Sequence, residues 1–220
     1  MNKTGFDALV QYIEKACPTD EPLEKALGHA EEFSLAVPDI ATSSLLSTLV
    51  AASTGHCAEQ SSEKPQVIAI TPASAVVGLH ILAGLPDNGI VTCIDPEAEH
   101  QNNARQIFRE SGYAPSRVRY LPSRPLDVMG RLANAAYQVI YADVDAIDLP
   151  AIVKAAWPLL SRRGTLVLTG SLLDGTIADD TRTDLDTAAA READELVSQL
   201  DNARVTRLPL GGGLTLVTKL

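Results

Sequence analysis

One stretch of the sequence, residues 66–97, limits the possible folds more than any other part of the chain. It has the sequence QVIAITPASAVVGLHILAGLPDNGIVTCIDPE. Residues 67–70 are a short apolar run between two prolines, which is typical of a strand buried on both faces. A helical pattern of apolar residues follows and ends near Gly84, and residues 90–94 form a second apolar run. A strand, a helix and a second strand in this order predict a parallel βαβ unit.

An acidic residue, Asp95, stands directly after the second of these strands. In parallel α/β sheets, ligands bind beyond the carboxyl ends of the strands. A carboxylate there can accept hydrogen bonds from two vicinal hydroxyl groups, so Asp95 is a candidate for binding a ribose. The alternative is that Asp95 caps the following helix, with Pro96 at its first position.

Composition and charge favour a globular protein that acts on a small molecule. The chain has 220 residues, of which 45% are hydrophobic and 21% charged, as in ordinary soluble domains. The apolar runs are shorter than the roughly 18 residues of a membrane span, and residues 1–10 lack a secretory signal. The three cysteines are an odd number and have no metal-like spacing, which favours a location in the reducing cytoplasm. The net charge of −10 argues against nucleic acid or an anionic membrane as the main partner.

Helical patterns precede the first strand. Amphipathic helices are expected to begin near Thr4, Asp20 and Thr42, and the polar residues 53–64 are expected to form a loop that leads into the sheet. We therefore divide a single expected domain into N-terminal helices and linker, residues 1–64, and a core, residues 65–220.

Helices and strands alternate after Asp95. Helices are expected over about residues 97–111, 125–133, 150–157 and 178–200, and strands over residues 117–121, 137–142 and 164–169. Two last strands, residues 204–208 and 214–219, flank a glycine-rich turn and predict an antiparallel hairpin. This order predicts a doubly wound α/β sheet with one reversed strand.

Several segments make the chain similar to a known family. They are IDPEAEHQNNAR, YQVIYADVDAIDLP, WPLLSRRGTLVL, LLDG and the C-terminal LPLGGGLTLVTKL. The chain resembles the class I S-adenosylmethionine-dependent methyltransferases, specifically the small bacterial O-methyltransferases related to catechol and caffeoyl-CoA O-methyltransferases. The resemblance implies a seven-stranded, mostly parallel sheet of order 3-2-1-4-5-7-6, with the last strand antiparallel, helices on both faces and an N-terminal helical extension. It also implies S-adenosylmethionine as cofactor, a small-molecule acceptor and a homodimer.

The loop after the first strand departs from the family's pattern. In the family this loop begins Glu-Ile-Gly-Thr, whereas here no glycine occurs between Ile70 and Gly78. Thr71 brings a Cβ atom where the backbone must approach the cofactor, and Pro72 lacks an N–H donor. Arg124 stands where relatives often carry an acidic residue that binds the adenine amino group. The positions that the resemblance assigns to the cofactor are Ala69, Thr71, Pro72, Ser74, Val77, Asp95, Arg124, Asp143 and Asp145.

The family's metal ligands are mostly missing. Catechol-type relatives hold a divalent cation with three residues, which correspond here to Asp143, Thr169 and Gly170. A hard cation requires several oxygen ligands, so we expect no metal site. The family's catalytic lysine corresponds to Ala146, so no general base is left by analogy. From its position alone, Asp143 is the candidate group to accept a proton from a substrate hydroxyl. The alternative for the turn from Asp143 to Asp145 is a solvated loop.

Two functions are compatible with these residues. The first is an S-adenosylmethionine-dependent O-methyltransferase that acts on a hydroxyl group of a small molecule without the family's metal. The alternative is a homologue without catalytic activity that serves as a dimeric binding or scaffold protein, which would explain the altered loop, the missing ligands and the missing lysine together. Binding of the cofactor distinguishes the two.

Overall fold

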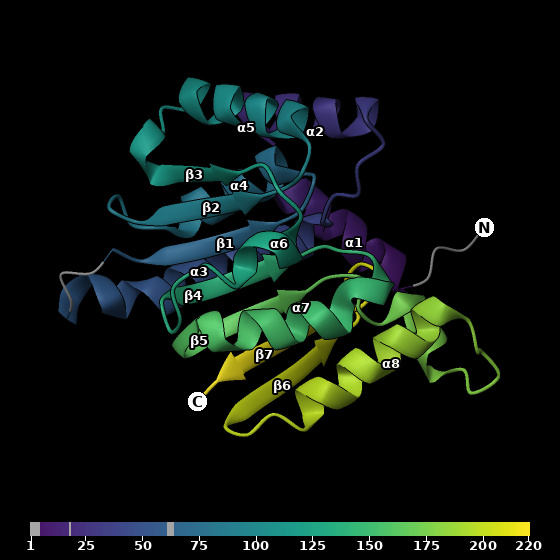
Figure 1. The fold of residues 1–220 in the computed structure, drawn as a ribbon. Coiled ribbons are helices and arrows are strands. Elements are labelled where there is room, and N and C mark those ends of the chain that lie inside the picture. The colour runs from purple at the N-terminus through teal and green to yellow at the C-terminus, as the bar shows by residue number, and fades with distance from the viewer. Residues whose placement is uncertain (1–4, 18, 61–63) are drawn as a thin grey trace.

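The strands form one seven-stranded sheet in the expected order β3-β2-β1-β4-β5-β7-β6 (Figure 1). The computed structural model describes residues 5–17, 19–60 and 64–220. The first five strands are parallel, and β7 runs antiparallel to both of its neighbours, so the predicted topology and hairpin are confirmed. The strand bounds are β1 Gln66–Ile70, β2 Ile90–Ile94, β3 Val118–Leu121, β4 Tyr137–Ala142, β5 Leu160–Leu168, β6 Ala203–Leu208 and β7 Leu214–Lys219.

Helices cover both faces of this sheet (Figure 1). Alternate residues of β1 point to opposite faces, and the two faces have separate cores. Val67 belongs to the core that includes residues of helices α2 to α5, and Ile68 belongs to the core that includes residues of helices α6 to α8. The helix bounds are α1 Gly5–Ala16, α2 Glu21–Glu32, α3 Ile40–Gln60, α4 Ser74–Gly84, α5 Ala98–Glu110, α6 Pro125–Met129, α7 Leu149–Ala156 and α8 Leu185–Ser198. Short 3-10 helices are η1 Pro115–Arg117, η2 Ala146–Asp148, η3 Trp157–Leu159 and η4 Leu173–Ala178.

The N-terminal helices differ from the expectation mainly at the end of α3. Helix α2 begins next to Asp20, as predicted, and Asp20 caps it, because its Oδ1 accepts from the backbone N of Leu23 at 3.0 Å. Helix α3 continues to Gln60, so the prediction of a loop from residue 53 is wrong for residues 53–60. Thr54 explains part of the difference: its side chain is fully buried and its Oγ1 donates to the carbonyl of Val50. Thr4 and residues 61–63 lie outside the described residues.

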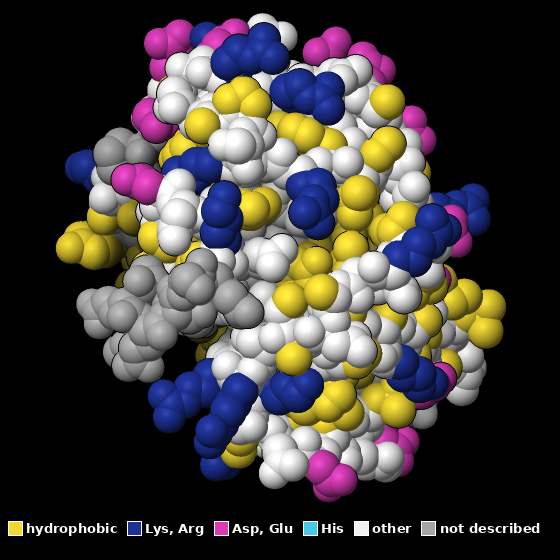
Figure 2. Space-filling model, turned by 60° about the vertical axis from the view of Figure 1, so that its left-hand side comes forward, with side chains coloured by type: hydrophobic (Ala, Val, Ile, Leu, Met, Phe, Trp, Pro, Cys, Tyr) yellow, Lys and Arg dark blue, Asp and Glu magenta, His cyan; other side chains and the backbone are white. Residues whose placement is uncertain are grey.

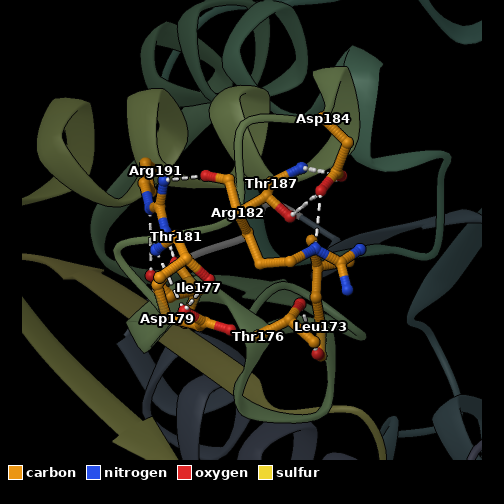
Figure 3. A network of polar contacts seen from close by, with 9 residues as sticks. All are labelled: Leu173, Thr176, Ile177, Asp179, Thr181, Arg182, Asp184, Thr187 and Arg191. Atoms are coloured by element: carbon orange, nitrogen blue, oxygen red, sulfur yellow. Dashed lines mark hydrogen bonds and ion pairs between the residues drawn. The ribbon is translucent and has the colours of Figure 1, made fainter.

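The helix expected from residue 178 begins later, at Leu185. The Asp184 carboxylate accepts from the backbone N of Thr187 at 3.0 Å and so caps α8 at this point. Figure 3 shows why the preceding segment is not helical: the guanidinium group of Arg191 donates to three backbone carbonyls. These carbonyls, of Ile177, Asp179 and Arg182, hold the loop in an irregular form that a local helical pattern cannot predict.

Basic side chains gather on the edge of the sheet where the parallel strands begin. Figure 2 shows this edge, on which Lys and Arg side chains are numerous and Asp and Glu side chains are few. Exposed basic residues near the strand starts include Lys64, Arg131, Arg162, Arg163 and Arg204. Because the whole chain carries a net charge of −10, negative charge is concentrated on the remaining surface. No helix in the described ranges combines the length and apolarity needed to cross a membrane.

Candidate functional site

A cavity of about 750 Å³ lies at the carboxyl ends of the parallel strands. This is where ligands bind in doubly wound sheets, and the volume is typical of small-molecule sites. Six of the nine residues predicted to contact the cofactor line it, and they come from the segments that follow β1, β2, β3 and β4. These six are Thr71, Pro72, Asp95, Arg124, Asp143 and Asp145.

The other three predicted cofactor residues, Ala69, Ser74 and Val77, are buried and are not among the residues that line the cavity. Ala69 is an interior residue of β1, and Val77 is an interior residue of α4. The Ser74 hydroxyl donates to the backbone carbonyl of Thr71 at 2.9 Å. Ser74 therefore stabilises the loop after β1, whereas Ala69 and Val77 belong to the hydrophobic core.

Asp95 lies in the cavity wall with both carboxylate oxygens hydrogen-bonded. Its Oδ2 accepts from Nδ1 of His100 at 2.9 Å, and its Oδ1 accepts from the backbone N of Glu97 at 3.2 Å. The side chain is only 3% exposed. Burial raises the pKa of Asp95, and the hydrogen bonds from Glu97 and His100 oppose this shift. The residue at the N-cap of α5 is Glu97, so Asp95 is not the helix cap.

His100 is a cavity residue that the sequence did not single out. Its ring is nearly perpendicular to two other rings, those of His29 and Phe33, with centroid distances of 5.7 and 5.6 Å. The ring is therefore held between helix α2 and the Asp95 carboxylate. The only signal in the sequence is its place in the first turn of the helix that follows Asp95.

The loop after β1 is stabilised by a side chain in place of glycine. Thr71, which is 2% exposed, accepts from the backbone N of Ala73 at 3.1 Å through its Oγ1. The same hydroxyl donates to Oδ2 of Asp143 at 3.3 Å. The backbone N of Asp143 also donates to the carbonyl of Ile70. The residue that disrupts the family's loop pattern thus connects this loop to the acidic turn after β4.

Asp143 is half-buried at the junction of two cavities. Burial raises the pKa of its carboxyl, Thr71 and Thr169 lower it through hydrogen bonds, and the nearby charge of Asp145 raises it. A carboxylate with a raised pKa is a stronger base, which suits proton transfer near neutral pH. Asp145 is exposed and lines the larger cavity.

The second cavity has a volume of about 160 Å³. Its walls come from the segment between α2 and α3, from the ends of β4 and β5, and from the turn between β6 and β7. Asp39 joins these walls, because Oδ1 accepts from the backbone N of Thr42 at 2.6 Å and Oδ2 accepts from that of Gly211 at 2.9 Å. Tyr141 and Thr169 line it as well.

The family's metal positions do not fit a divalent cation in this chain. Asp143 has a carboxylate, but the Thr169 hydroxyl donates to the carbonyl of Ala142 at 3.2 Å and Gly170 has no side chain. Within the described ranges, no group of three or more His, Cys, Asp and Glu side chains is placed to hold a metal ion. The donor set therefore lacks the several oxygen ligands that a hard cation requires.

The lining suits a ligand that carries hydroxyl groups and positive charge. Six carboxylates line the larger cavity against one arginine, Arg124. Hydroxyl groups can donate to carboxylates, and a cation is attracted by them more strongly in a partly buried site than in water. The acidic residues are Asp95, Glu97, Asp127, Asp143, Asp145 and Asp148.

Comparison of the sequence with known proteins identifies O-methyltransferases as its relatives. A family model described as O-methyltransferase matches residues 63–220. A protein of Mycolicibacterium smegmatis with a provisional O-methyltransferase name is 31% identical over 211 residues, which are 96% of each chain. A similarly named protein of Mycobacterium leprae is 33% identical over 94% of this chain and 89% of its own length.

Solved structures share the whole fold. A crystal structure of a protein from Corynebacterium glutamicum has a TM-score of 0.92 and 54% identity, covering 98% of this chain and 97% of its own. The O-methyltransferase TomG from Streptomyces achromogenes, solved with S-adenosylmethionine, has a TM-score of 0.83 and 21% identity, with 96% of each chain covered. At that identity the likeness concerns the fold alone.

Proposed function

The chain belongs to the O-methyltransferase family, and from this premise we propose that it transfers a methyl group from S-adenosylmethionine to a hydroxyl group of a small molecule. We propose further that it does so without the divalent cation of catechol-type relatives. The observation that carries the proposal is the pair of adjoining cavities with Asp143 between them. One cavity is large enough for the cofactor, and the other offers room for an acceptor next to it.

The larger cavity supports the cofactor assignment through its donor set. Asp95 would accept hydrogen bonds from the ribose hydroxyls, because each carboxylate oxygen retains a free lone pair after bonding His100 or Glu97. The carboxylates of Asp143 and Asp145 would favour a positively charged ligand. Thr71, Pro72 and Arg124 complete the proposed contacts. When bound, S-adenosylmethionine supplies an electrophilic methyl group on a sulfonium ion.

Asp143 is proposed as the general base. Its pKa is raised by burial, and the Thr71 hydroxyl donates to one carboxylate oxygen, which fixes the orientation in which the carboxylate would accept the proton of an acceptor hydroxyl. Alignment of the acceptor oxygen with the methyl group would supply most of the acceleration, since positioning contributes up to about 7–11 kcal/mol.

Calorimetric titration with S-adenosylhomocysteine tests the cofactor assignment. The wild type should bind with a micromolar dissociation constant. Asp95→Asn should weaken binding by roughly 10- to 100-fold, because a hydrogen bond to a charged group contributes about 1.5–3 kcal/mol. Asp201→Asn, an exposed change in the turn before β6, is the matched control and should have no effect. Absence of binding at millimolar ligand would reject the enzyme and favour the inactive, dimeric scaffold.

Assembly and location are also proposals. A homodimer through the N-terminal helices is supported by the family resemblance and by Leu9 and Tyr12 of α1, which are 53% and 71% exposed. Light scattering should give twice the mass of one chain, and Leu9→Ser with Tyr12→Ser should shift the equilibrium toward the monomer. A cytoplasmic location is supported by the odd number of cysteines, three in the whole chain.

A further inference from the structure

The small cavity beside Asp143 has room for a small acceptor. Its volume is about 160 Å³, and Ala36 and Asp143 line both this cavity and the larger one. An engineered protein cavity of about 150 Å³ holds a benzene molecule. The cavity therefore accommodates a single six-membered ring or an aliphatic molecule of similar size, with one end next to Asp143.

The same cavity is negatively charged. Asp39 and Asp143 both line it, and its described lining residues include no lysine, arginine or histidine. Burial raises the pKa of the Tyr141 phenol, and the charges of Asp143 and Asp39 raise it further. Tyr141 is 1% exposed and lines the cavity, so its phenol lies in the field of both carboxylates. The N-terminus of α3 offsets only about half a charge at Asp39.

The distribution of charge over the molecule strengthens this field. Among the described residues, the larger cavity adds five further carboxylates against Arg124, and lysine and arginine side chains are numerous on the opposite edge of the sheet (Figure 2). An acceptor that carries a carboxylate or phosphate would meet repulsion from both carboxylates. An acceptor that carries an ammonium group would be attracted.

We propose that the acceptor is a small alcohol or phenol that carries a protonated amine, with its hydroxyl group at Asp143 and its ammonium group at Asp39. This inference rests on the proposed function and names the substrate class of the same site. The orientation follows from the lining, because Asp143 borders the cofactor cavity whereas Asp39 borders only the small one. Asp39 is held by the backbone N–H groups of Thr42 and Gly211, so its carboxylate is fixed before the amine binds.

Three probes of nearly equal size and different charge test the proposal. They are 4-hydroxybenzylamine, 4-hydroxybenzyl alcohol and 4-hydroxybenzoate. Each is titrated calorimetrically into the wild-type protein at neutral pH, with and without saturating S-adenosylhomocysteine. The amine should bind at least tenfold more tightly than the alcohol, and the benzoate should bind more weakly than the alcohol. Equal affinities, a preference for the benzoate or no binding of any probe would overturn the proposal.

A variant identifies the carboxylate that binds the amine. Asp39→Asn removes the charge and keeps an oxygen for only one of the two N–H groups, those of Thr42 and Gly211, so part of its effect is on the cavity wall and is shared by both probes. Loss of the charge should weaken binding of the amine at least tenfold more than binding of the alcohol. Asp201→Asn should change neither. Asp39 does not line the larger cavity, so unchanged binding of S-adenosylhomocysteine confirms that the variant is folded.

The outcomes separate this inference from the proposed function. Binding of S-adenosylhomocysteine without a preference for the amine overturns the inference and leaves the methyltransferase proposal intact. A preference for the amine without any binding of S-adenosylhomocysteine overturns the methyltransferase proposal and supports the amine site. The wild-type series requires no variant, so the inference stays testable if Asp39→Asn does not fold.

Discussion

Replacing Thr71 by valine removes one hydroxyl group that makes two hydrogen bonds in the cavity wall. Its Oγ1 accepts from the backbone N of Ala73 at 3.1 Å and donates to Oδ2 of Asp143 at 3.3 Å. Valine has nearly the same shape as threonine, so the change isolates the hydroxyl group and leaves the packing of this buried position intact.

The expected loss of stability follows from these two bonds. An unpaired, buried N–H group at Ala73 costs about 1–3 kcal/mol. The bond to Asp143 is long, so it contributes less than the usual 1.5–3 kcal/mol of a bond to a charged partner, about 1 kcal/mol. We expect the free energy of unfolding at neutral pH to fall by about 2–4 kcal/mol.

This loss should depend on pH in a defined direction. Burial raises the pKa of Asp143 in the folded protein, so its contribution to stability is largest when the carboxyl is protonated and decreases as the pH rises through the folded pKa. The Thr71 hydroxyl lowers that pKa by stabilising the charged form, and its removal raises the pKa further. Thr71→Val should therefore cost more stability at neutral pH than in mild acid.

Urea unfolding of Thr71→Val and wild type over about pH 5 to 8 measures both effects. Thr206→Val, an exposed change on the edge strand β6, is the matched control and should stay within about 0.5 kcal/mol of wild type. A variant that matches this control, or that loses more stability in acid than at neutral pH, would refute the role given to the Thr71 hydroxyl.

Further predictions concern the reaction, the cofactor and the turn between β6 and β7. Asp143→Asn should lower kcat by about 10²–10⁴-fold, measured as formation of S-adenosylhomocysteine, with less than a tenfold change in cofactor affinity. His100→Ala should weaken binding of S-adenosylhomocysteine about tenfold by releasing Asp95, and His100→Asn should restore most of it, because its amide nitrogen takes the place of Nδ1 and donates the same hydrogen bond. Gly213→Ala should lower the free energy of unfolding by about 2–4 kcal/mol, because Gly213 has a φ of +95° and a Cβ atom would lie 2.3 Å from the side chain of Leu172.

The sheet could be predicted from the sequence because its information is local. The apolar runs after Pro65 and before Asp95 mark buried strands, and the glycine-rich turn before Leu214 marks the hairpin. The strand order came from the family resemblance, since periodicity alone does not determine how strands are placed. The β2, β4 and β7 bounds agree with the predicted ones, and the remaining strands begin or end within a few residues of them.

The parts that could not be predicted depend on contacts between distant residues. The start of α8 depends on Arg191, whose guanidinium binds carbonyls up to 14 residues earlier. The small cavity depends on the hydrogen bond between Asp39 and Gly211, which are 172 residues apart. The place of His100 in the site depends on rings from α2. Such contacts leave no periodic signal, so the sequence indicated Asp95 and Asp143 but neither Asp39 nor His100.

Titration of the wild-type protein with S-adenosylmethionine, first in EDTA and then in magnesium, tests the central claim most directly. Binding in EDTA isolates what the chain's own residues contribute at the carboxyl ends of the strands. We predict a micromolar dissociation constant that is the same in both conditions, within a factor of about two. Binding that appears only with magnesium would contradict the metal-free site around Asp143, and no binding at millimolar cofactor would contradict the methyltransferase itself.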